Sequence, residues 1–276
     1  MAEISSEVLL RLDRVTVEFN DEPALREVTF ELRKGETVVI LGASGSGKTV
    51  LLKTAMGLIS PSAGTVSLLG RSITGLRERD VMGLRGRMGV LFQEGGLFDS
   101  LTIEENVAYP LLNQKALECP AEEIRSRVEE ALQFVELEHT LEKLPSELSG
   151  GMRRRVGIAR AIVSHPEFLL YDSPTAGLDP ITANTIMALI AKERDLRRTT
   201  TALATHRFQD GQLLANYYYN AKTQRLEPIG ANGEAMDVRT RFVVMGEGRI
   251  VFEGSQEELE RCQDTYVAKF SRRWKG

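Results

Sequence analysis

A glycine-rich octapeptide is the first segment whose residue types and spacing could do chemistry. It reads Gly42-Ala43-Ser44-Gly45-Ser46-Gly47-Lys48-Thr49 and fits G-x-x-x-x-G-K-[ST] at every fixed position. Its glycines let backbone N–H groups close around phosphate oxygens, Lys48 would reach the β- and γ-phosphates, and Thr49 would offer a hydroxyl to Mg²⁺. A helix that continues from Val50 would direct its positive end at the anion. The predicted nucleotide contacts are Gly42, Ser44, Gly45, Ser46, Gly47, Lys48, Thr49 and Val50.

A second candidate anion-binding element is Leu148-Ser149-Gly150-Gly151-Met152. Ser149 supplies a hydroxyl and a helix N-cap, and Gly150 and Gly151 allow a close backbone approach. Taken alone, Ser-Gly-Gly also occurs in plain loops. The segment 152–162 that follows predicts a helix with an apolar face and a basic face, and we expect most of its arginines to be solvated.

Strands and helices alternate around these motifs. Residues 8–19 and 28–32 alternate between apolar and polar types, which predicts half-buried strands. Residues 37–41 form a continuous apolar strand that leads into the glycine-rich loop. Further strands are predicted at 64–70, 88–92, 167–171, 200–205 and 241–245, and helices at 50–58, 121–135 and 181–196. This order predicts an α/β fold with a parallel sheet, and the helical pattern of 101–162 predicts an inserted subdomain.

Composition, net charge and the length of apolar runs limit the classes of protein to which the chain could belong. The 276 residues are 42% hydrophobic and 27% charged, with a net charge of −4, which argues against a general nucleic-acid binder. The two cysteines and three histidines show no metal-ligand spacing. No apolar run approaches the roughly 18 residues that span a bilayer, and residues 1–7 do not resemble a signal peptide. We therefore expect a cytosolic chain that reaches a membrane only through a partner.

Together these motifs resemble an ATP-binding cassette over nearly the whole chain. The resemblance implies a P-loop NTPase (RecA-like) α/β core with an N-terminal antiparallel β subdomain and an inserted α-helical subdomain. It implies a nucleotide-binding domain over 1–255, a helical subdomain at about 95–163 and a C-terminal helical tail at 256–276. It also implies a head-to-tail dimer in which Ser149, Gly150 and Gly151 of one subunit close on the ATP of the other.

The resemblance assigns further roles one residue at a time. Phe19 stacks on adenine, although a core position is the alternative for this residue. Gln93 contacts Mg²⁺ or the attacking water, and Asp172 holds Mg²⁺ through water. Asp179 belongs to the loop Ala176-Gly177-Leu178-Asp179 that crosses the dimer interface. His206 follows a strand and contacts the γ-phosphate.

Position 173 departs from the family pattern. The family places a glutamate after the magnesium aspartate, where its carboxylate polarises the water that attacks the γ-phosphate, and this chain has Ser173. A general base contributes about 10²–10⁴-fold, and a serine hydroxyl is a poor base. Three explanations stay open: a degenerate site that hydrolyses slowly, compensation by His206 or Glu94, or a deliberate change that traps the ATP-bound dimer.

The segment that follows Gln93 suggests a subtype. Residues 94–102 and 104–111, together with Met152 after the Ser-Gly-Gly element, resemble the Mla/Mce class of lipid-transport cassettes. Leu97, Phe98, Val107 and Tyr109 could form a groove for the membrane subunit, and core packing is the alternative that we expect for some of them. This resemblance implies integral membrane permease subunits, a second cassette in a homodimer, a lipid-binding Mce-type protein, and a location on the cytoplasmic face of the inner membrane.

Two segments lie outside the family pattern. Residues 216–239 are extra and predict a β-hairpin or a surface loop, and 256–276 reads as a helical tail with a basic end. A cassette for another small solute, a soluble DNA-repair or translation ATPase, and a regulatory nucleotide-binding subunit are the alternative functions. The preferred prediction is an ATP- and Mg²⁺-dependent ATPase subunit that powers lipid transport.

Overall fold

The computed structural model describes residues 7–93, 95–113, 119–230 and 240–271. These residues divide into two compact units, one formed by 1–76 with 191–276 and the other by 77–190. The expected helical subdomain at 95–163 lies inside the second unit. Glu94, residues 231–239 of the expected insertion, and Arg272, Arg273 and Lys275 of the basic tail lie outside the described residues.

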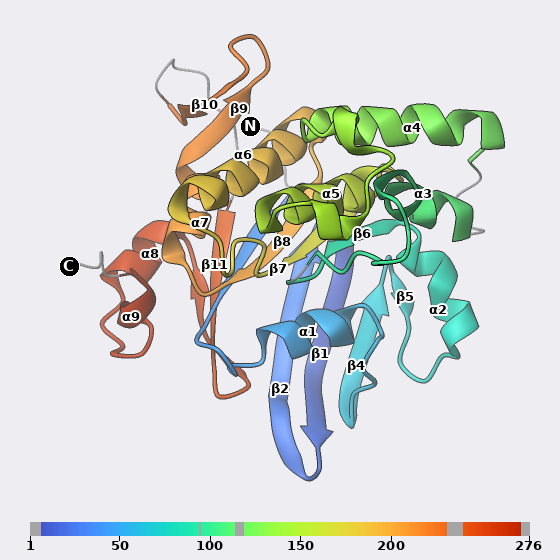
Figure 1. Ribbon diagram of the computed structural model, residues 1–276. Coiled ribbons are helices and arrows are strands. Elements are labelled where there is room, and N and C mark those ends of the chain that lie inside the picture. The colour runs from blue at the N-terminus through green and yellow to red at the C-terminus, as the bar shows by residue number, and fades with distance from the viewer. Residues whose placement is uncertain (1–6, 94, 114–118, 231–239, 272–276) are drawn as a thin grey trace. The chain divides into compact units, whose positions relative to one another are not determined.

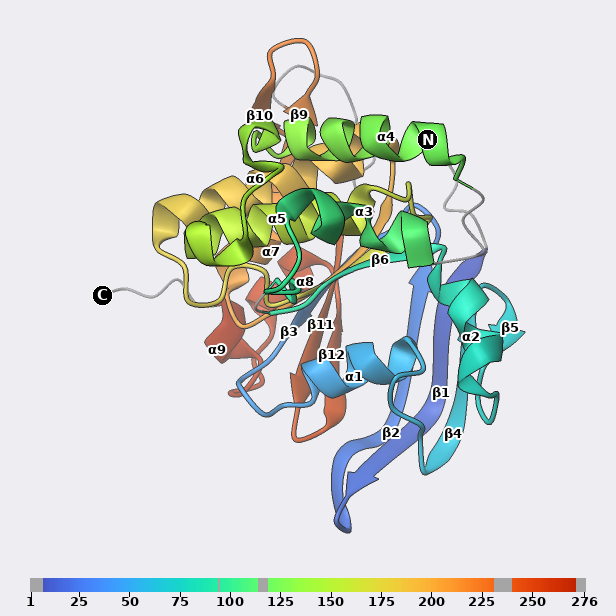
Figure 2. The ribbon, with the colours of Figure 1, turned by 45° about the vertical axis from the view of Figure 1, so that its right-hand side comes forward.

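The first unit contains an antiparallel sheet near its N-terminus (Figure 1). Its strand order is β2-β1-β4-β5. The strands are β1 (Val8–Phe19), β2 (Glu22–Arg33), β4 (Ala63–Leu68) and β5 (Arg71–Ser72). The alternation predicted for 8–19 is present in β1, where several register shifts adjust it to its neighbours. Helix α1 (Lys48–Ala55) lies against these strands in both ribbon views (Figures 1 and 2).

A mostly parallel group of strands forms the other sheet of the first unit. Strand β3 (Thr37–Leu41) pairs in parallel with β11 (Thr240–Gly246) and with β8 (Thr200–Thr205), and β12 (Arg249–Gly254) runs antiparallel to β11. Every residue of β3 and β8 is buried, as expected for strands covered on both faces. The remaining helices of this unit are α7 (Phe208–Asn216), α8 (Gln256–Arg261) and α9 (Ala268–Ser271).

The second unit contains one parallel strand pair and most of the helices. Strand β6 (Met88–Leu91) pairs with β7 (Phe168–Asp172), and all of β7 is buried. The helices are α2 (Glu78–Arg85), α3 (Ile103–Asn113), α4 (Ala121–Phe134) and α5 (Gly150–Ile162), with short 3-10 turns at Glu138–Thr140 and Pro145–Glu147. Helix α6 (Pro180–Arg197) begins in this unit and ends in the first.

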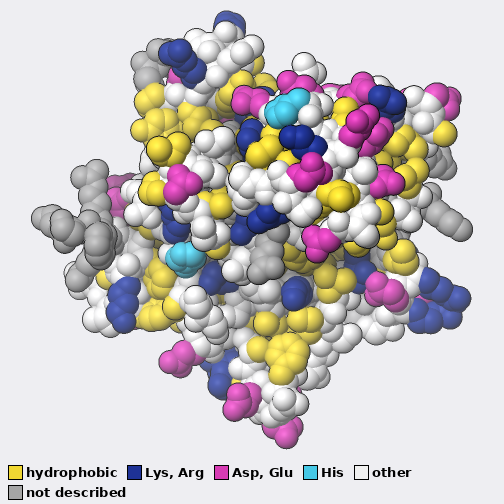
Figure 3. All heavy atoms as spheres, viewed as in Figure 1, with side chains coloured by type: hydrophobic (Ala, Val, Ile, Leu, Met, Phe, Trp, Pro, Cys, Tyr) yellow, Lys and Arg dark blue, Asp and Glu magenta, His cyan; other side chains and the backbone are white. Residues whose placement is uncertain are grey.

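Most segments predicted as strands and helices match elements of the structure. Two predicted elements differ in extent. Helix α1 begins at Lys48 and ends at Ala55, three residues before the predicted end at 58. The expected helical tail contains only the short helices α8 and α9 within its described part. The expected insertion contains a β-hairpin of β9 (Tyr217–Asn220) and β10 (Arg225–Pro228). Hydrophobic side chains form several small patches among acidic and basic groups on the face shown in Figure 3.

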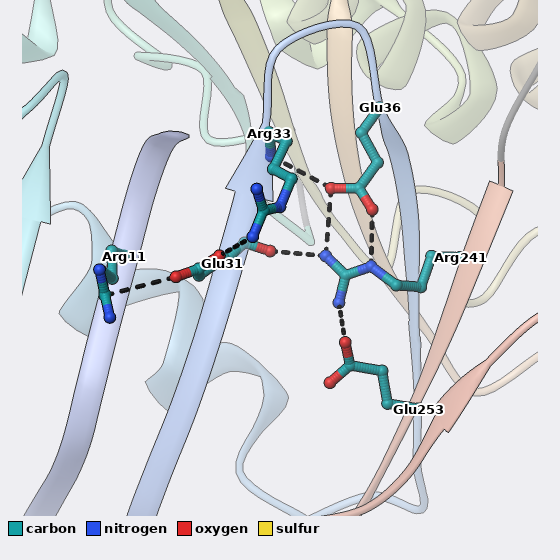
Figure 4. Close-up of polar contacts among 6 residues, drawn as sticks. All are labelled: Arg11, Glu31, Arg33, Glu36, Arg241 and Glu253. Atoms are coloured by element: carbon teal, nitrogen blue, oxygen red, sulfur yellow. Dashed lines mark hydrogen bonds and ion pairs between the residues drawn. The ribbon is translucent and has the colours of Figure 1, made fainter. Parts of the chain in front are cut away.

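A network around Arg241 joins distant parts of the first unit (Figure 4). Arg241 donates from Nε to Glu36 Oε1 at 2.6 Å and from Nη2 to the Glu31 carbonyl at 2.6 Å. Its Nη1 donates to Glu253 Oε1 at 2.8 Å. Burial opposes the charge of Arg241, but its hydrogen bond to Glu36 and the charges of Glu36 and Glu253 outweigh that cost and raise its pKa. One guanidinium therefore links β11 with β2, β12 and the turn that precedes β3.

No helix in the described part of the chain is both long enough and apolar enough to span a membrane.

Candidate nucleotide-binding site

The glycine-rich loop connects β3 to α1 within the first unit. Ala43, Ser44 and Gly45 are exposed at its outer turn, whereas Ser46 and Lys48 are buried. Gly45 has φ +79° and Gly47 has φ +103°, a region that favours glycine. A Cβ on Gly47 would also lie 2.9 Å from the Ala24 carbonyl oxygen. The loop thus adopts a conformation that side chains at these two positions would oppose, and its backbone is open to solvent where phosphate oxygens would bind.

The Lys48 side chain folds back over the start of the loop 42–49. Its Nζ donates to the carbonyl oxygens of Gly42 at 2.8 Å and Ala43 at 2.9 Å, and lies 3.5 Å from Ser46 Oγ. The side chain is 7% exposed. A buried ammonium group held against a backbone loop is well placed for an anion, because a phosphate would offset its desolvation. This arrangement fits a nucleotide triphosphate, with Thr49 half-buried on the first turn of α1.

His206 lies directly after the buried strand β8 and is exposed. The turn around it is held by buried Asp210, whose Oδ2 accepts a hydrogen bond from Thr205 Oγ1 at 2.7 Å. Thr205 Oγ1 also accepts from the Arg207 backbone N–H at 3.1 Å. Thr205 and Asp210 are supporting residues that the sequence analysis missed. Their signal was a Thr and an Asp flanking the histidine at a strand end.

Phe19 ends β1 next to a tight turn in which Asn20 and Asp21 have positive φ. The side chain is 48% exposed, so the alternative of a core position is wrong for this residue. An exposed aromatic ring can stack on a base. The stacking role itself stays a prediction.

Strand β7 of the second unit ends at Asp172, which is buried and 4% exposed. The Ser173 hydroxyl donates to Asp172 Oδ1 at 3.2 Å, and Ser173 has φ +50°. The residue at the expected glutamate position is therefore a hydrogen-bond donor to the predicted magnesium ligand. In this arrangement it supplies no carboxylate that could accept a proton from water.

Asp179 lies at the exposed start of α6 and caps that helix. Its Oδ1 accepts from the backbone N–H groups of Ile181 and Thr182, each at 3.0 Å, and Oδ2 accepts from Thr182 Oγ1 at 2.5 Å. The hydrogen bonds from the Thr182 side chain and backbone lower the pKa of Asp179. The residue predicted to act at a dimer interface thus also stabilises the first turn of its own helix.

Ser149 caps α5 as predicted, because its hydroxyl accepts the Met152 backbone N–H at 3.2 Å. Ser149 and Gly150 are exposed. A Cβ on Gly151 would lie 2.5 Å from Thr182 Cγ2. Gly151 is therefore required by packing within the second unit, a reason that the sequence analysis did not anticipate.

The expectation of a solvated arginine face on α5 is wrong. Arg153 donates to the Leu148 carbonyl, and Arg155 donates to the Val135 carbonyl. Arg154 is buried and donates to the carbonyls of Phe92 and Ala176. Arg160 donates to the carbonyls of Gly95 and Gly96, and burial lowers its pKa. Periodicity placed these arginines on one side of a helix, but only the fold shows which carbonyls they reach.

Gln93 is exposed on a turn closed by a hydrogen bond from the Gly95 N–H to the Phe92 carbonyl at 2.9 Å. Of the residues considered for a groove nearby, Val107 is 0% exposed and belongs to the core, the alternative expected for some of them. Phe98 and Tyr109 are exposed, with ring centroids 4.5 Å apart. Leu112 on α3 is 62% exposed and was not anticipated.

Buried Asn106 on α3 holds the loop that carries Phe98. Its Nδ2 donates to the carbonyls of Phe98, Leu101 and Thr102, each at 3.0 Å. Its Oδ1 accepts from the Phe98 N–H at 2.7 Å. Asn106 lies within the 104–111 motif, and nothing in the local sequence pattern indicates this buried role.

The oxygen donors predicted for a metal are a hydroxyl, a carboxylate and a side-chain amide. Such hard ligands suit Mg²⁺, which retains water and phosphate ligands rather than needing a full protein cage. Among the described residues, no group of three or more His, Cys, Asp and Glu side chains could hold a metal ion by itself. The donor set therefore fits a metal that arrives with a nucleotide.

A phosphate loop between a parallel strand and a helix, combined with a capped Ser-Gly-Gly helix, defines an ATP-binding cassette of the P-loop NTPase class. The ABC transporter family model matches residues 25–176. The chain belongs to the ABC transporter family, as an ATP-binding cassette with the fold of ABC-type ATPases.

Relatives with curated descriptions include importers of an amino acid and a protein named for a lipid. Methionine import ATP-binding protein MetN 1 of Bacillus thuringiensis subsp. konkukian (strain 97-27) is 42% identical over 183 residues, or 66% of this chain and 53% of that protein. The chain thus matches about half the length of such relatives. Protein TRIGALACTOSYLDIACYLGLYCEROL 3, chloroplastic, of Arabidopsis thaliana is 34% identical over 98% of this chain and 75% of that protein.

Solved cassettes share the fold. The dimeric ATP-binding cassette MJ0796, in a post-hydrolysis state bound to ADP and Pi, has a TM-score of 0.72 and 29% identity over 89% of this chain and 98% of that chain. The cassette cbiO1 from Clostridium perfringens, part of the transporter complex cbiONQ, has a TM-score of 0.71 and 28% identity over 92% of this chain and 91% of that chain. These similarities agree with the fold class predicted from the sequence.

Proposed function

We propose that this chain is the ATP-binding subunit of a membrane transporter. The observation that carries the proposal is the loop 42–49, in which Lys48 is buried over two backbone carbonyls and the outer turn is exposed. In this proposal the loop binds the phosphates of ATP and Thr49 binds Mg²⁺. Asp172 and Gln93 keep the metal-binding roles, and His206 and Phe19 the nucleotide-binding roles, that the family resemblance assigns to them.

Nucleotide binding is tested by removing the ammonium group from the loop. Lys48→Met should weaken ATP binding at least tenfold, measured by titration calorimetry with Mg²⁺ present. Lys53→Met is the matched control, because Lys53 lies in the last turn of the same helix and away from the loop. Equal binding by Lys48→Met and the unmodified chain would reject the phosphate-loop assignment.

Hydrolysis depends on position 173. The Ser173 hydroxyl is engaged with Asp172, so we infer slow turnover by the chain as it stands. Ser173→Glu should raise the kcat for ATP by about 10²–10⁴-fold, the usual contribution of a general base. Ser173→Gln has similar size without the charge and should stay slow. Similar rates for the serine and glutamate forms would place the base elsewhere.

The proposed partners are a second copy of the chain and a permease. Exposed Phe98, Tyr109 and Leu112 form an apolar surface on the second unit, which we assign to the membrane subunit. Leu112→Asp should reduce co-purification with the permease, whereas Leu196→Asp, a change of another exposed leucine, should not. Retained co-purification by Leu112→Asp would reject this assignment.

The proposed cargo is a phospholipid or related lipid, and a lipid-binding Mce-type protein is a proposed partner. In this proposal the chain itself lies at the cytoplasmic face of the inner membrane, held there by the permease. Two observations support a lipid cargo: the segment that follows Gln93, and the relative named for a galactolipid, which aligns over 98% of this chain. Methionine import is the second candidate, because relatives 42% identical carry that description. Stimulation of the permease-bound ATPase by phospholipid in vesicles supports the first, and stimulation by methionine supports the second.

The domain organisation is part of the same proposal. We assign residues 1–255 to the nucleotide-binding domain, about 95–163 to its helical subdomain and about 216–239 to an insertion. Residues 256–276 form a C-terminal tail. The two compact units of the structure divide near residue 76 and within helix α6, so limited proteolysis should leave α6 intact and cut in exposed loops instead.

A further inference from the structure

The second unit contains two loops that carry residues assigned to the reaction, with Gln93 exposed on one and Asp179 exposed at the end of the other. One is the turn after β6, where Gln93 follows Phe92, and the other is the loop 173–179, which ends at Asp179. Each is stabilised by local backbone hydrogen bonds: Gly95 N–H to the Phe92 carbonyl in the first, and Ala176 N–H to the Ser173 carbonyl at 3.1 Å in the second. Neither set of local bonds connects one loop with the other.

Arg154 makes that connection. It lies on α5, five residues after Ser149, and is 7% exposed. Its Nη1 donates to the Phe92 carbonyl at 3.4 Å and its Nη2 to the Ala176 carbonyl at 3.1 Å. The Phe92 carbonyl therefore accepts both the N–H that closes the Gln93 turn and a nitrogen of the guanidinium. A single side chain thus contacts both loops from the helix that Ser149 caps.

The chemistry of this contact suits arginine and not lysine. A guanidinium is planar and presents its donors in a fixed fork, so two acceptors on different segments are held at a set separation. An ammonium group is a compact point charge on a flexible stem and does not impose that separation. The close approach of α5 helps, because a Cβ on Gly157 would lie 2.5 Å from Leu91 Cδ1 at the end of β6.

We propose that Arg154 is a positioning residue that makes the Gln93 turn, the 173–179 loop and the Ser149 end of α5 move as one body. A displacement of the Gln93 turn would then be transmitted to Asp179 and Ser149 through one guanidinium. Arg154 touches neither nucleotide nor metal in this role. It acts on the carbonyls beside the residues that do, and this inference rests on the roles proposed for Gln93 and Asp179.

Amide hydrogen exchange, measured without nucleotide, tests whether Arg154 connects the Gln93 turn with the 173–179 loop. Arg154→Lys should lower protection in both 92–96 and 173–179 together. The matched control is Arg155→Lys, a neighbour on the same helix whose contact is the Val135 carbonyl, and it should leave both segments unchanged. Loss in only one segment, or equal effects of the two variants, would overturn the proposal.

Turnover tests the functional part in the Ser173→Glu background. Arg154→Lys should lower kcat at least tenfold with the KM for ATP unchanged, because the phosphate loop is not altered. If Arg154→Lys only destabilised the fold, less of the protein would be active. The kcat per folded molecule would then be unchanged once the folded fraction is taken into account. If kcat is unchanged although both 92–96 and 173–179 lose exchange protection, Arg154 connects the two loops but has no role in turnover, and the functional part of the proposal is rejected.

If Ser173→Glu shows no turnover even with Arg154 intact, that result counts against the proposed function. The exchange experiment alone then tests whether Arg154 connects the two loops. If Arg154→Lys does not fold, Arg154→Gln replaces it. The glutamine amide can donate to one carbonyl but is too short to span both, so it should uncouple the two segments. Coupled protection in Arg154→Gln would overturn the proposal.

Discussion

At the scale of single residues, the clearest case is Asp179. The structure shows it capping α6 through Ile181 and Thr182, and its role at a dimer interface stays a prediction from the family motif. Replacing Asp179 would remove the cap as well as any contact with a partner, so its capping role must be measured separately.

The capping role predicts a specific pH dependence. The hydrogen bonds of Thr182 lower the pKa of Asp179 below its unfolded value, which is about 3.9. The stabilisation is therefore fully present above that value and is lost as the pH falls through the lower folded pKa. Thr182→Val, which removes the hydroxyl, should lower the urea midpoint at pH 7 and lose this effect in strong acid.

Thr185→Val provides the control for that measurement, because the Thr185 hydroxyl donates to the Ile181 carbonyl within α6 and does not touch Asp179. A destabilisation by Thr182→Val that persists unchanged in strong acid would contradict the capping account.

At the scale of elements, the buried ionic contacts decide how segments distant in sequence are joined. Glu36 accepts from Arg241, which lies 205 residues later. The side chain of Glu36 is 7% exposed, so removing Arg241 would leave a buried carboxylate without its counter-charge and, among the described residues, with only the hydrogen bond from the Arg33 backbone N–H. Such a contact is invisible to periodicity, because each residue alone reads as an ordinary surface charge.

Arg241→Met should lower the free energy of unfolding by about 3 kcal/mol, the low end for removing one partner of a buried pair. Urea denaturation measures the change. The double variant Arg241→Met/Glu36→Gln should recover part of the loss, because no buried charge is then unpaired. A double variant less stable than the single one would contradict this explanation.

The β9–β10 hairpin is joined to α6 in the same manner. Arg194 donates to Asp195 and to the Leu214 and Tyr217 carbonyls, and Asp195 Oδ2 accepts the Tyr219 N–H at 2.6 Å. Both side chains of the ion pair are nearly fully buried, at 5% and 3% exposed. The β9–β10 hairpin, the described part of the extra segment, is thus anchored to α6 by buried contacts.

Arg194→Met should therefore raise amide exchange in β9 and lower the free energy of unfolding by about 3 kcal/mol. The exchange change should be confined to 214–228. Arg197→Met is the comparison variant, because Arg197 lies about one turn later on α6 and pairs with Glu193 on the same helix. Normal protection of β9 in Arg194→Met would show that the hairpin is held by other contacts.

At the scale of the whole molecule, the question is whether two cassettes form a dimer. A solved relative with a similar fold is dimeric and bound to ADP and Pi. In this chain, Ser149 and Gly150 are exposed at the start of α5. An exposed N-cap that satisfies only one helix N–H leaves others available for an anion.

We expect ATP with Mg²⁺ to convert the chain from monomer to dimer, because slow hydrolysis would leave the ATP-bound state populated. Ser149→Glu should abolish this dimer by placing a negative charge against the phosphates, while ATP binding by Lys48 persists. Ser149→Thr keeps the hydroxyl cap and should still dimerise. Light scattering after gel filtration measures the mass, and an ATP-dependent dimer of Ser149→Glu would contradict the head-to-tail arrangement.

The sequence by itself determined the chemistry and most of the elements. The loop 42–49, the capped Ser149 helix and the acid at the end of β7 are local patterns, because strand and helix signals depend on neighbours within a few residues. The family and fold class follow from the order of those patterns. The strands β3 and β8 could be predicted from composition, because burial on both faces requires continuous apolar runs.

Only the tertiary structure decided what the polar side chains reach. The arginines of α5 appeared to form a solvated face, yet Arg154 and Arg160 bond carbonyls more than twenty and sixty residues away. Val107 appeared suited to a groove and is a core residue. The reason is physical: a side-chain hydrogen bond depends on which carbonyls the assembled backbone brings within reach of the donor, and no local pattern in the chain specifies that.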